Sequence, residues 1–570
     1  MKFLRRAILL LIVAAVLIWM FVPSPGLHVE PGSTLGFELS GSYVEAAAAP
    51  LLDRMLGDGR APFVSVLSEL AKAQRDPRLA AVVLRIRDLD VGWGMAQELR
   101  DAVRELSASG RRTLAYLETG SLGANLEYYV ASAADEVVIA PATSSPLVGL
   151  AMEYLFLGGL WEKLGAGVEA IGSGEYKSGA ETLAGSKMSE AHREMATSLL
   201  DSTFEQFVQG IAEGRGLEPA YVRETIDSAP VTPEELVGLG LADAVASYDE
   251  AVARAGSGAL VEAADYAGVD PASLGFDPVA RFALIYGSGT VAMGEGTRSR
   301  TGGFVLTSDT VSDALEQAAE DPEIRAIVFR IDSPGGSPLA SDIVWRALAR
   351  ARDSGKPVVA SVSNTAASGG YYVMCGADAV VAPPGSLVGS IGVFAIRPVI
   401  GGLLEKLGIG FETMTRGAYA DLLLATQPLS DAGRERLLRE ITGLYDVFVA
   451  RVAKGRGLEP AQVDAVGRGR VWTGAQGLER GLVDELGGLR AAVRRAKREA
   501  GLAEDADVAL VPYPAPLSLA DQLAEALLQT AIRAAQPLPV PRLLAGLEGL
   551  LAPLAEGGPL LVPPLVMEIR

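Results

Sequence analysis

Two side chains that could form a catalytic pair stand in different halves of the chain. Ser368 lies in AASGGYY, after an apolar run and before a predicted helix, and its small neighbours let a substrate backbone approach closely. Amide dipoles at a helix start also favour developing negative charge. Lys177, in GEYKSG, could act as a general base if burial lowered its pKa by about three units from about 10.4. Glu175 and Glu181 are close in sequence and would have to point away from it.

Three glycines and a second serine complete the predicted site. The turn DSPGGSP offers the backbone amides of Gly335 and Gly336 as an oxyanion hole, and Gly369, directly after Ser368, is a third candidate. Ser390, in VGSIG, is the candidate for orienting the lysine amine. Taken singly, each motif also has a structural explanation: a serine that caps a helix, an exposed lysine, or a glycine turn that is only a turn.

An internal duplication connects the two halves. DPRLAAVVLRI returns as DPEIRAIVFRI, YYVASAADEVVIA returns as YYVMCGADAVVAP, and GRGLEPA occurs twice. With Tyr128 set against Tyr371, Ser368 faces Asn125 and Lys177 faces Ala420. A nucleophile therefore survives only in the second copy and a base only in the first, which suggests a division of labour between duplicated domains.

Both copies show the same alternation of short apolar strands and longer helical patterns. Such alternation predicts an α/β fold with mostly parallel sheets. We expect helices over 64–75, 95–109 and 126–133 with strands over 80–86, 113–117 and 137–140 in the first copy. In the second copy we expect helices over 308–320 and 339–353 with strands over 326–331 and 357–361.

These patterns divide the chain into four parts. Residues 1–25 are a predicted membrane anchor, 26–270 the domain that supplies the base, 271–500 the domain that carries the nucleophile, and 501–570 a tail. The segment 26–60 reads as a mixed lead-in and 271–278 as the linker. In the tail, VALVPYP predicts a strand, and a capping signal at Ser518 predicts an amphipathic helix. For its apolar remainder, packing on a neighbouring subunit or domain is favoured over contact with membrane or an apolar substrate.

The composition excludes several functions. A net charge of −20 argues against nucleic-acid binding. The single cysteine, Cys375, allows no intrachain disulfide and no Cys/His metal cluster, and nothing in the sequence calls for a cofactor. The two histidines, His28 and His192, lie in unpromising places for a Ser-His-Asp triad, so serine chemistry must use another base.

The N-terminus predicts an anchor and a location. Lys2, Arg5 and Arg6 precede the apolar run AILLLIVAAVLIWMFV, and the positive charges favour a cytoplasmic N-terminus. No small-x-small cleavage site follows, so an uncleaved single span is favoured over a cleaved signal peptide. We expect a single-pass protein of the inner (plasma) membrane with its catalytic domains on the extracytoplasmic (periplasmic) side.

Together these motifs resemble the long, two-domain form of the signal peptide peptidase A (protease IV) family, membrane-bound serine proteases with a Ser/Lys dyad. The resemblance covers nearly the whole chain, although no motif matches beyond about Gly501. It implies tandem crotonase/ClpP-like domains, a nucleophile at Ser368 and a general base at Lys177 from the other domain. It also implies a bowl-shaped homotetramer whose apolar interior accepts extended peptides. The expected function is degradation of membrane-derived peptides, such as signal-peptide remnants.

Two other functions fit the fold. The first is an acyl-CoA hydratase, hydrolase or carboxyltransferase of the crotonase type, because a fold does not determine a reaction. The export signal and the pairing of serine with lysine argue against it. The second is an anchored scaffold without activity, in which both residues are structural.

Overall fold

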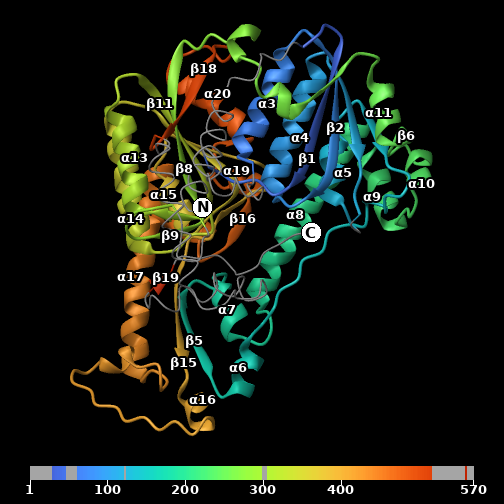
Figure 1. The fold of residues 1–570 in the computed structure, drawn as a ribbon. Helices are drawn as coiled ribbons and strands as arrows, with labels where there is room; N and C mark the ends of the chain where they lie inside the picture. Colours follow the sequence, from blue (N-terminus) through green and yellow to red (C-terminus); the bar gives the residue numbers. More distant parts are fainter. Residues whose placement is uncertain (1–28, 47–60, 121–122, 298–303, 516–558, 561–570) are drawn as a thin grey trace, which may run out of the picture.

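Two α/β domains lie side by side in the computed structural model, which describes residues 29–46, 61–120, 123–297, 304–515 and 559–560 (Figure 1). Each domain is built on an open, mostly parallel sheet with helices on its faces. The predicted α/β class with mostly parallel sheets is therefore confirmed.

The first domain holds a six-stranded sheet in the order β6-β4-β3-β2-β1-β7, and all of these pairings are parallel. Its strands are β1 (Ser33–Gly41), β2 (Leu79–Leu89), β3 (Arg112–Leu117), β4 (Glu136–Ile139), β6 (Ala244–Val245) and β7 (Leu260–Glu262). Helices α3 (Phe63–Arg75) and α4 (Trp93–Ala108) pack on one face, and α11 (Tyr248–Ala255) packs on the other. Because both faces of β2 are covered, its residues form a nearly continuous apolar run.

The second domain holds an eight-stranded sheet in the order β16-β14-β12-β11-β8-β18; in addition, β13 pairs with β12, and β17 pairs with β13. Its strands are β8 (Ala280–Ser288), β11 (Ile324–Ser333), β12 (Val358–Ala367), β13 (Ala379–Ala382), β14 (Leu387–Gly389), β16 (Val471–Thr473), β17 (Glu485–Leu486) and β18 (Val508–Tyr513). Helices α13 (Ser308–Glu320) and α14 (Pro338–Asp353) cover one face. The other face packs on α20 (Leu489–Glu499) and on α4 of the first domain, so one apolar core runs through both domains.

The duplication read from the sequence is visible in the fold. The series β2-α4-β3-α5-β4 returns as β11-α14-β12-α15-β13, where α5 is Asn125–Ala131 and α15 is Gly369–Met374. Each copy then contains a helix of 26 residues, α8 (Glu190–Arg215) in the first and α17 (Asp431–Arg456) in the second.

The structure corrects the sequence analysis at the edges of both copies. Among the strands that were not predicted are β1, in the supposed lead-in, and β8, directly after the supposed linker. The strand predicted in the tail is present as β18, and it pairs with β8, so the second sheet extends past the predicted domain end at residue 500. The predicted anchor, residues 1–25, and the helix predicted from Ser518 lie outside the described residues. Within the described ranges, no helix is both long enough and apolar enough to span a bilayer.

Each copy contributes one strand to a ribbon in an arm that extends from the main sheets (Figure 1). β5 (Gly167–Ser173) of the first copy pairs antiparallel with β15 (Val393–Val399) of the second, from Ser173 opposite Val393 to Gly167 opposite Val399. The helices α6 (Gly158–Leu164), α7 (Gly179–Ala184) and α16 (Gly401–Lys406) flank this ribbon, and β19 (Pro559–Leu560) pairs with the other edge of β15. The chain that follows β5 is therefore brought to the chain that precedes β15.

A buried ion cluster also joins the two domains. Arg330 of β11 is fully buried, and its Nη2 lies 2.6 Å from Glu45 Oε1 and 2.6 Å from Glu98 Oε1. Glu45 follows β1, and Glu98 lies on α4, so both carboxylates come from the first domain. Since a buried charge is stable only with its partners in place, this cluster requires the two domains to be docked.

We expect Arg330→Ala to lower the free energy of unfolding by about 3–5 kcal/mol, because it leaves two buried carboxylates without a counter-charge. Urea unfolding of the full chain measures this difference. Arg325→Ala, at an exposed position on the same strand, is the matched control and should change stability by less than about 0.5 kcal/mol. Equal stability of the two variants would contradict this role of the cluster.

Candidate active site

Ser368 occupies a sharp, buried turn between a strand and a helix. It follows β12 directly and precedes α15, with φ 55° and ψ −118°, and its side chain is inaccessible to solvent. A non-glycine residue rarely adopts this backbone conformation, which is tolerated where the surrounding structure determines it. Here the Ser368 N–H donates to the carbonyl oxygen of Gly389 on β14 at 2.7 Å. The turn therefore places Ser368 beside the end of β14, close to Lys177.

Lys177 reaches Ser368 from the other domain through the β5–β15 ribbon. Ser173 lies opposite Val393, so Lys177, four residues after β5, meets Ser390, three residues before β15. Its Nζ lies 2.7 Å from Ser368 Oγ, 2.9 Å from Ser390 Oγ and 2.9 Å from the carbonyl oxygen of Ser390. The structure thus brings together the three side chains that the sequence analysis selected.

The three contacts match the valence of a neutral amine. An uncharged lysine has two N–H donors and one lone pair, whereas the ammonium form has three donors and no acceptor. The two donors can go to the two oxygens of Ser390, which leaves the lone pair facing the Ser368 hydroxyl. This assignment makes Nζ an acceptor for the serine proton.

Burial without a counter-charge favours the neutral form of this amine. Desolvation holds the pKa of Lys177 well below its usual range, and no carboxylate acts to restore it. Glu175 lies 3.7 Å from Arg468, and Glu181 accepts from Ser189 N–H at 3.2 Å and lies 3.1 Å from the ring of His192. Both acidic neighbours in the sequence are therefore paired with other groups.

The glycine turn after β11 provides a backbone amide beside the nucleophile. Gly335 N–H donates to Ser333 Oγ at 3.2 Å, so this amide is already used. A Cβ built on Gly369 would lie 2.9 Å from the Gly336 nitrogen, which shows how closely the two residues approach. Gly336 has φ 158°, and a Cβ there would lie 2.1 Å from the carbonyl oxygen of Val291. In the described part of the chain, the amides of Gly336 and Gly369 donate to no other protein group, and they are the better candidates for an oxyanion hole.

Asp332, at the end of β11, was not predicted as part of the site. Its Oδ1 accepts from the Thr365 N–H at 3.0 Å, which fixes the end of β12 directly before Ser368. Burial raises its pKa to about 7. An aspartate directly after a buried strand was the available signal, but its partner can be identified only in three dimensions.

The counterparts in the other copy lack this arrangement. Asn125 begins α5, as Ser368 precedes α15, but its side-chain amide donates to the Gly149 carbonyl oxygen at 2.9 Å, and no lysine among the described residues donates to it. Ala420 begins a short 3₁₀ helix, η2 (Ala420–Leu423), far along the chain from β15. The site is therefore formed once, from one half of each copy.

The chain is similar in sequence to known proteins over most of its length. The model of Peptidase family S49 matches the chain twice, at residues 107–262 and 350–503. The chain is 32% identical over 503 residues to Serine protease SPPA, chloroplastic, from Arabidopsis thaliana, covering 86% of this chain and 73% of the relative. It is 30% identical over 459 residues to Protease 4 from Salmonella typhi (77% and 72%), and 28% identical over 465 residues to Protease 4 from Haemophilus influenzae (78% and 74%).

The two α/β domains, the buried serine and these matches define a serine peptidase. The chain belongs to Peptidase family S49, with one family domain in each copy.

A buried neutral lysine must make stability depend on pH. Its depressed pKa means that, between the folded value and about 10.4, folding requires release of a proton. The stability contribution is fully present above about pH 10.4 and is lost as pH falls toward the folded pKa, by at most about 1.4 kcal/mol per pH unit. We expect Lys177→Met to remove this dependence and to be more stable than the parent at pH 7. Urea unfolding at several pH values measures both slopes, and parallel curves would show that Lys177 is charged in the folded protein.

Proposed function

We propose that this protein is a membrane-anchored endopeptidase in which Ser368 is the nucleophile and Lys177 the general base. The observation that supports these roles most directly is the 2.7 Å contact of Lys177 Nζ with Ser368 Oγ, in a site where both acidic neighbours of the lysine are paired elsewhere. An activated serine needs a base within hydrogen-bonding reach and a group that orients that base. Ser390 supplies the second requirement through two oxygens.

The reaction proceeds in two acyl-transfer steps. Ser368 Oγ attacks the scissile carbonyl carbon while its proton passes to Lys177 Nζ, and the resulting oxyanion accepts hydrogen bonds from the amides of Gly336 and Gly369. The ammonium group then gives its proton to the leaving amine, which leaves an acyl ester on Ser368. Water loses a proton to the neutral lysine and attacks this ester. The lysine then returns that proton to Ser368 Oγ as the bond between Oγ and the acyl carbon breaks, which releases the new carboxyl terminus and restores the free enzyme. The oxygens of Ser390 stabilise the lysine when it is briefly charged.

We propose membrane-derived peptides, such as cleaved signal peptides, as substrates. The apolar N-terminal run after Lys2, Arg5 and Arg6 supports an anchor in the inner membrane, with the two domains on the extracytoplasmic side. Such a location would bring the site close to apolar peptides left in the bilayer after export.

We also propose self-association, as a homotetramer by family resemblance. Large apolar side chains are exposed on the segments before α6 and after α16, which lead into and out of the arm, including Leu155, Met414 and Leu423, which are 68%, 89% and 87% exposed. Contiguous exposed apolar surface is typical of sites that pack on another protein or on a membrane.

The central test is peptide hydrolysis by the full chain in detergent. Ser368→Ala should abolish turnover, and Lys177→Met should lower kcat/KM by about 10²–10⁴-fold, the usual contribution of a general base. Lys187→Met is the control, because Lys187 is an exposed lysine in the same domain as Lys177, and this variant should match the parent enzyme. Turnover by Ser368→Ala would rule out this function.

Ser390 is tested separately. Ser390→Ala removes the Oγ contact to Nζ and keeps the backbone carbonyl contact, so we expect kcat to fall about 10-fold, the equivalent of one hydrogen bond. Steady-state kinetics with the same peptide measures this effect. An unchanged kcat would show that Ser390 does not orient the base.

Membrane location and assembly can be tested on the same preparation. We expect the full chain to stay with membranes after carbonate washing, and Leu10→Arg with Leu11→Arg to release it, because charge in the apolar run is costly. Light scattering of the detergent-solubilised protein should give four times the 59.4 kDa chain mass. Release of the parent protein by carbonate would contradict the anchor, and a monomer mass would contradict the tetramer.

A further inference from the structure

Lys177 lies in the loop 174–178, which we term the lysine loop. A short segment of the second domain runs between this loop and Ser390. The carbonyl oxygen of Arg468 accepts from the Tyr176 N–H at 3.0 Å, and that of Arg470 accepts from the Ser390 N–H at 2.8 Å. Between them, a Cβ built on Gly469 would lie 2.5 Å from Lys177 Cβ. The backbone of residues 468–470 therefore contacts both sides of the base, and its position determines theirs.

The side chain of Arg470 fastens this segment to the first domain. Its Nη1 lies 2.7 Å from Glu194 Oε1 on α8, and its guanidinium lies 4.7 Å from the ring centroid of Tyr176. The same guanidinium lies 4.4 Å from the ring centroid of Trp472 on β16. The Tyr176 hydroxyl donates to Glu194 Oε2 at 3.1 Å. These four side chains, which we term the Arg470 clamp, connect α8, the lysine loop and β16.

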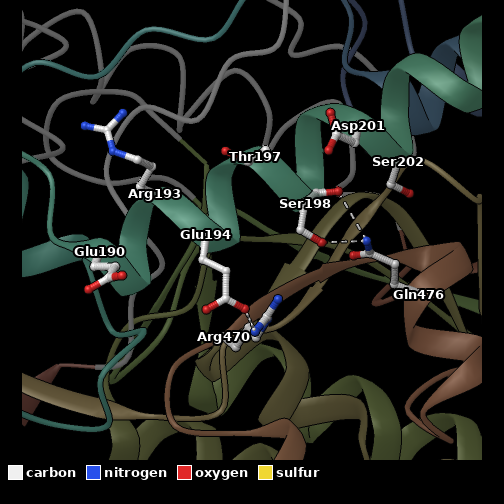
Figure 2. Close-up of a pocket in the computed structure, with 9 residues that line it drawn as sticks. All are labelled: Glu190, Arg193, Glu194, Thr197, Ser198, Asp201, Ser202, Arg470 and Gln476. Carbon is white, nitrogen blue, oxygen red and sulfur yellow. Dashed lines mark hydrogen bonds and ion pairs between the residues drawn. The ribbon is translucent and has the colours of Figure 1, made fainter.

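Stacking on two aromatic rings and low exposure distinguish the Arg470 clamp from an ordinary surface ion pair. Figure 2 shows Arg470 directed at Glu194 beside a polar hollow under α8, and Glu194 itself is exposed, so the charge attraction alone contributes little. The Arg470 side chain is only 17% exposed, because its guanidinium is flanked by Tyr176 and Trp472. A planar guanidinium can stack and bind a carboxylate at once, and a lysine ammonium cannot do both in this way.

The base depends on exclusion of water more than on any charge. Desolvation alone lowers the pKa of Lys177, so entry of water would return it toward about 10.4. The charged groups that surround the lysine loop are engaged in pairs: Glu175 with Arg468, Glu181 with His192, and Glu194 with Arg470. Tyr176, the residue before the base, is the one that the Arg470 clamp holds.

We propose that Arg470 is a positioning residue for the general base. It excludes water from Lys177 by holding Tyr176 against the 468–470 segment. This inference rests on the proposed roles of Ser368 and Lys177. Arg470 does not touch Ser368, and it acts through the chain on either side of Lys177.

The test is the pH dependence of kcat/KM for peptide hydrolysis by the full chain in detergent. In the parent enzyme, the acidic limb reports deprotonation of the base in the free enzyme. Arg470→Ala should move the midpoint of this limb up by about one pH unit or more, lower kcat/KM at pH 7 at least about 10-fold, and recover much of it at alkaline pH. Arg470→Lys keeps the charge and loses the stack, and it should shift the midpoint in the same direction.

Arg480→Ala is the matched control. Arg480 also stacks on Trp472, at 3.8 Å, but its hydrogen bonds go to Gln476 and Glu479 and not to the lysine loop. The midpoint of the acidic limb of kcat/KM in Arg480→Ala should therefore equal that of the parent enzyme. A loss of activity by both Arg470 variants that is uniform across pH, with an unmoved midpoint, would overturn the inference and indicate a merely structural role. Turnover by Ser368→Ala, or an undiminished kcat/KM in Lys177→Met, would instead overturn the proposed function, so the two failures are distinguishable.

Discussion

An amine can take a proton from serine near neutral pH only if the protein keeps it uncharged, and this requirement explains much of the structure. Lys177 is buried against two oxygens of Ser390 and the hydroxyl of Ser368, and desolvation is what lowers its pKa. A single carboxylate beside Nζ would cancel that effect. The pairing of Glu175 with Arg468 and of Glu181 with His192 is therefore as important as the contact with Ser368 itself.

The duplication offers a physical route to such a site. Each domain alone would have to bury its own lysine beside its own serine. The pairing of β5 with β15 instead lets the first domain supply the base to a turn of the second domain. The β5–β15 register makes this delivery specific, because a slip of one residue would turn every side chain of the strand to the opposite face. The shared core and the Arg330 cluster then hold the two domains in the relation that the site requires.

The sequence revealed the parts that repeat or carry unusual motifs, and not those defined by distant contacts. Apolar and helical periodicity was enough for β2, β3 and β4 in the first copy and for β11 and β12 in the second, and the unequal survival of Ser368 and Lys177 pointed to a combined site. β1 was missed because Ser, Thr, Gly and Glu interrupt its apolar residues, and their burial depends on β2 and β7. Arg470 was missed for a similar reason: its partners Tyr176 and Glu194 belong to the other domain.

The most direct measurement is the titration of Lys177 itself. The ¹⁵N resonance of its Nζ, assigned by its loss in Lys177→Met, follows the protonation of this amine in the folded, full-length protein. The account predicts a neutral amine at pH 7 and a midpoint well below about 10.4. A midpoint close to 10.4 would mean that the lysine is charged beside Ser368, and the serine would then have no base.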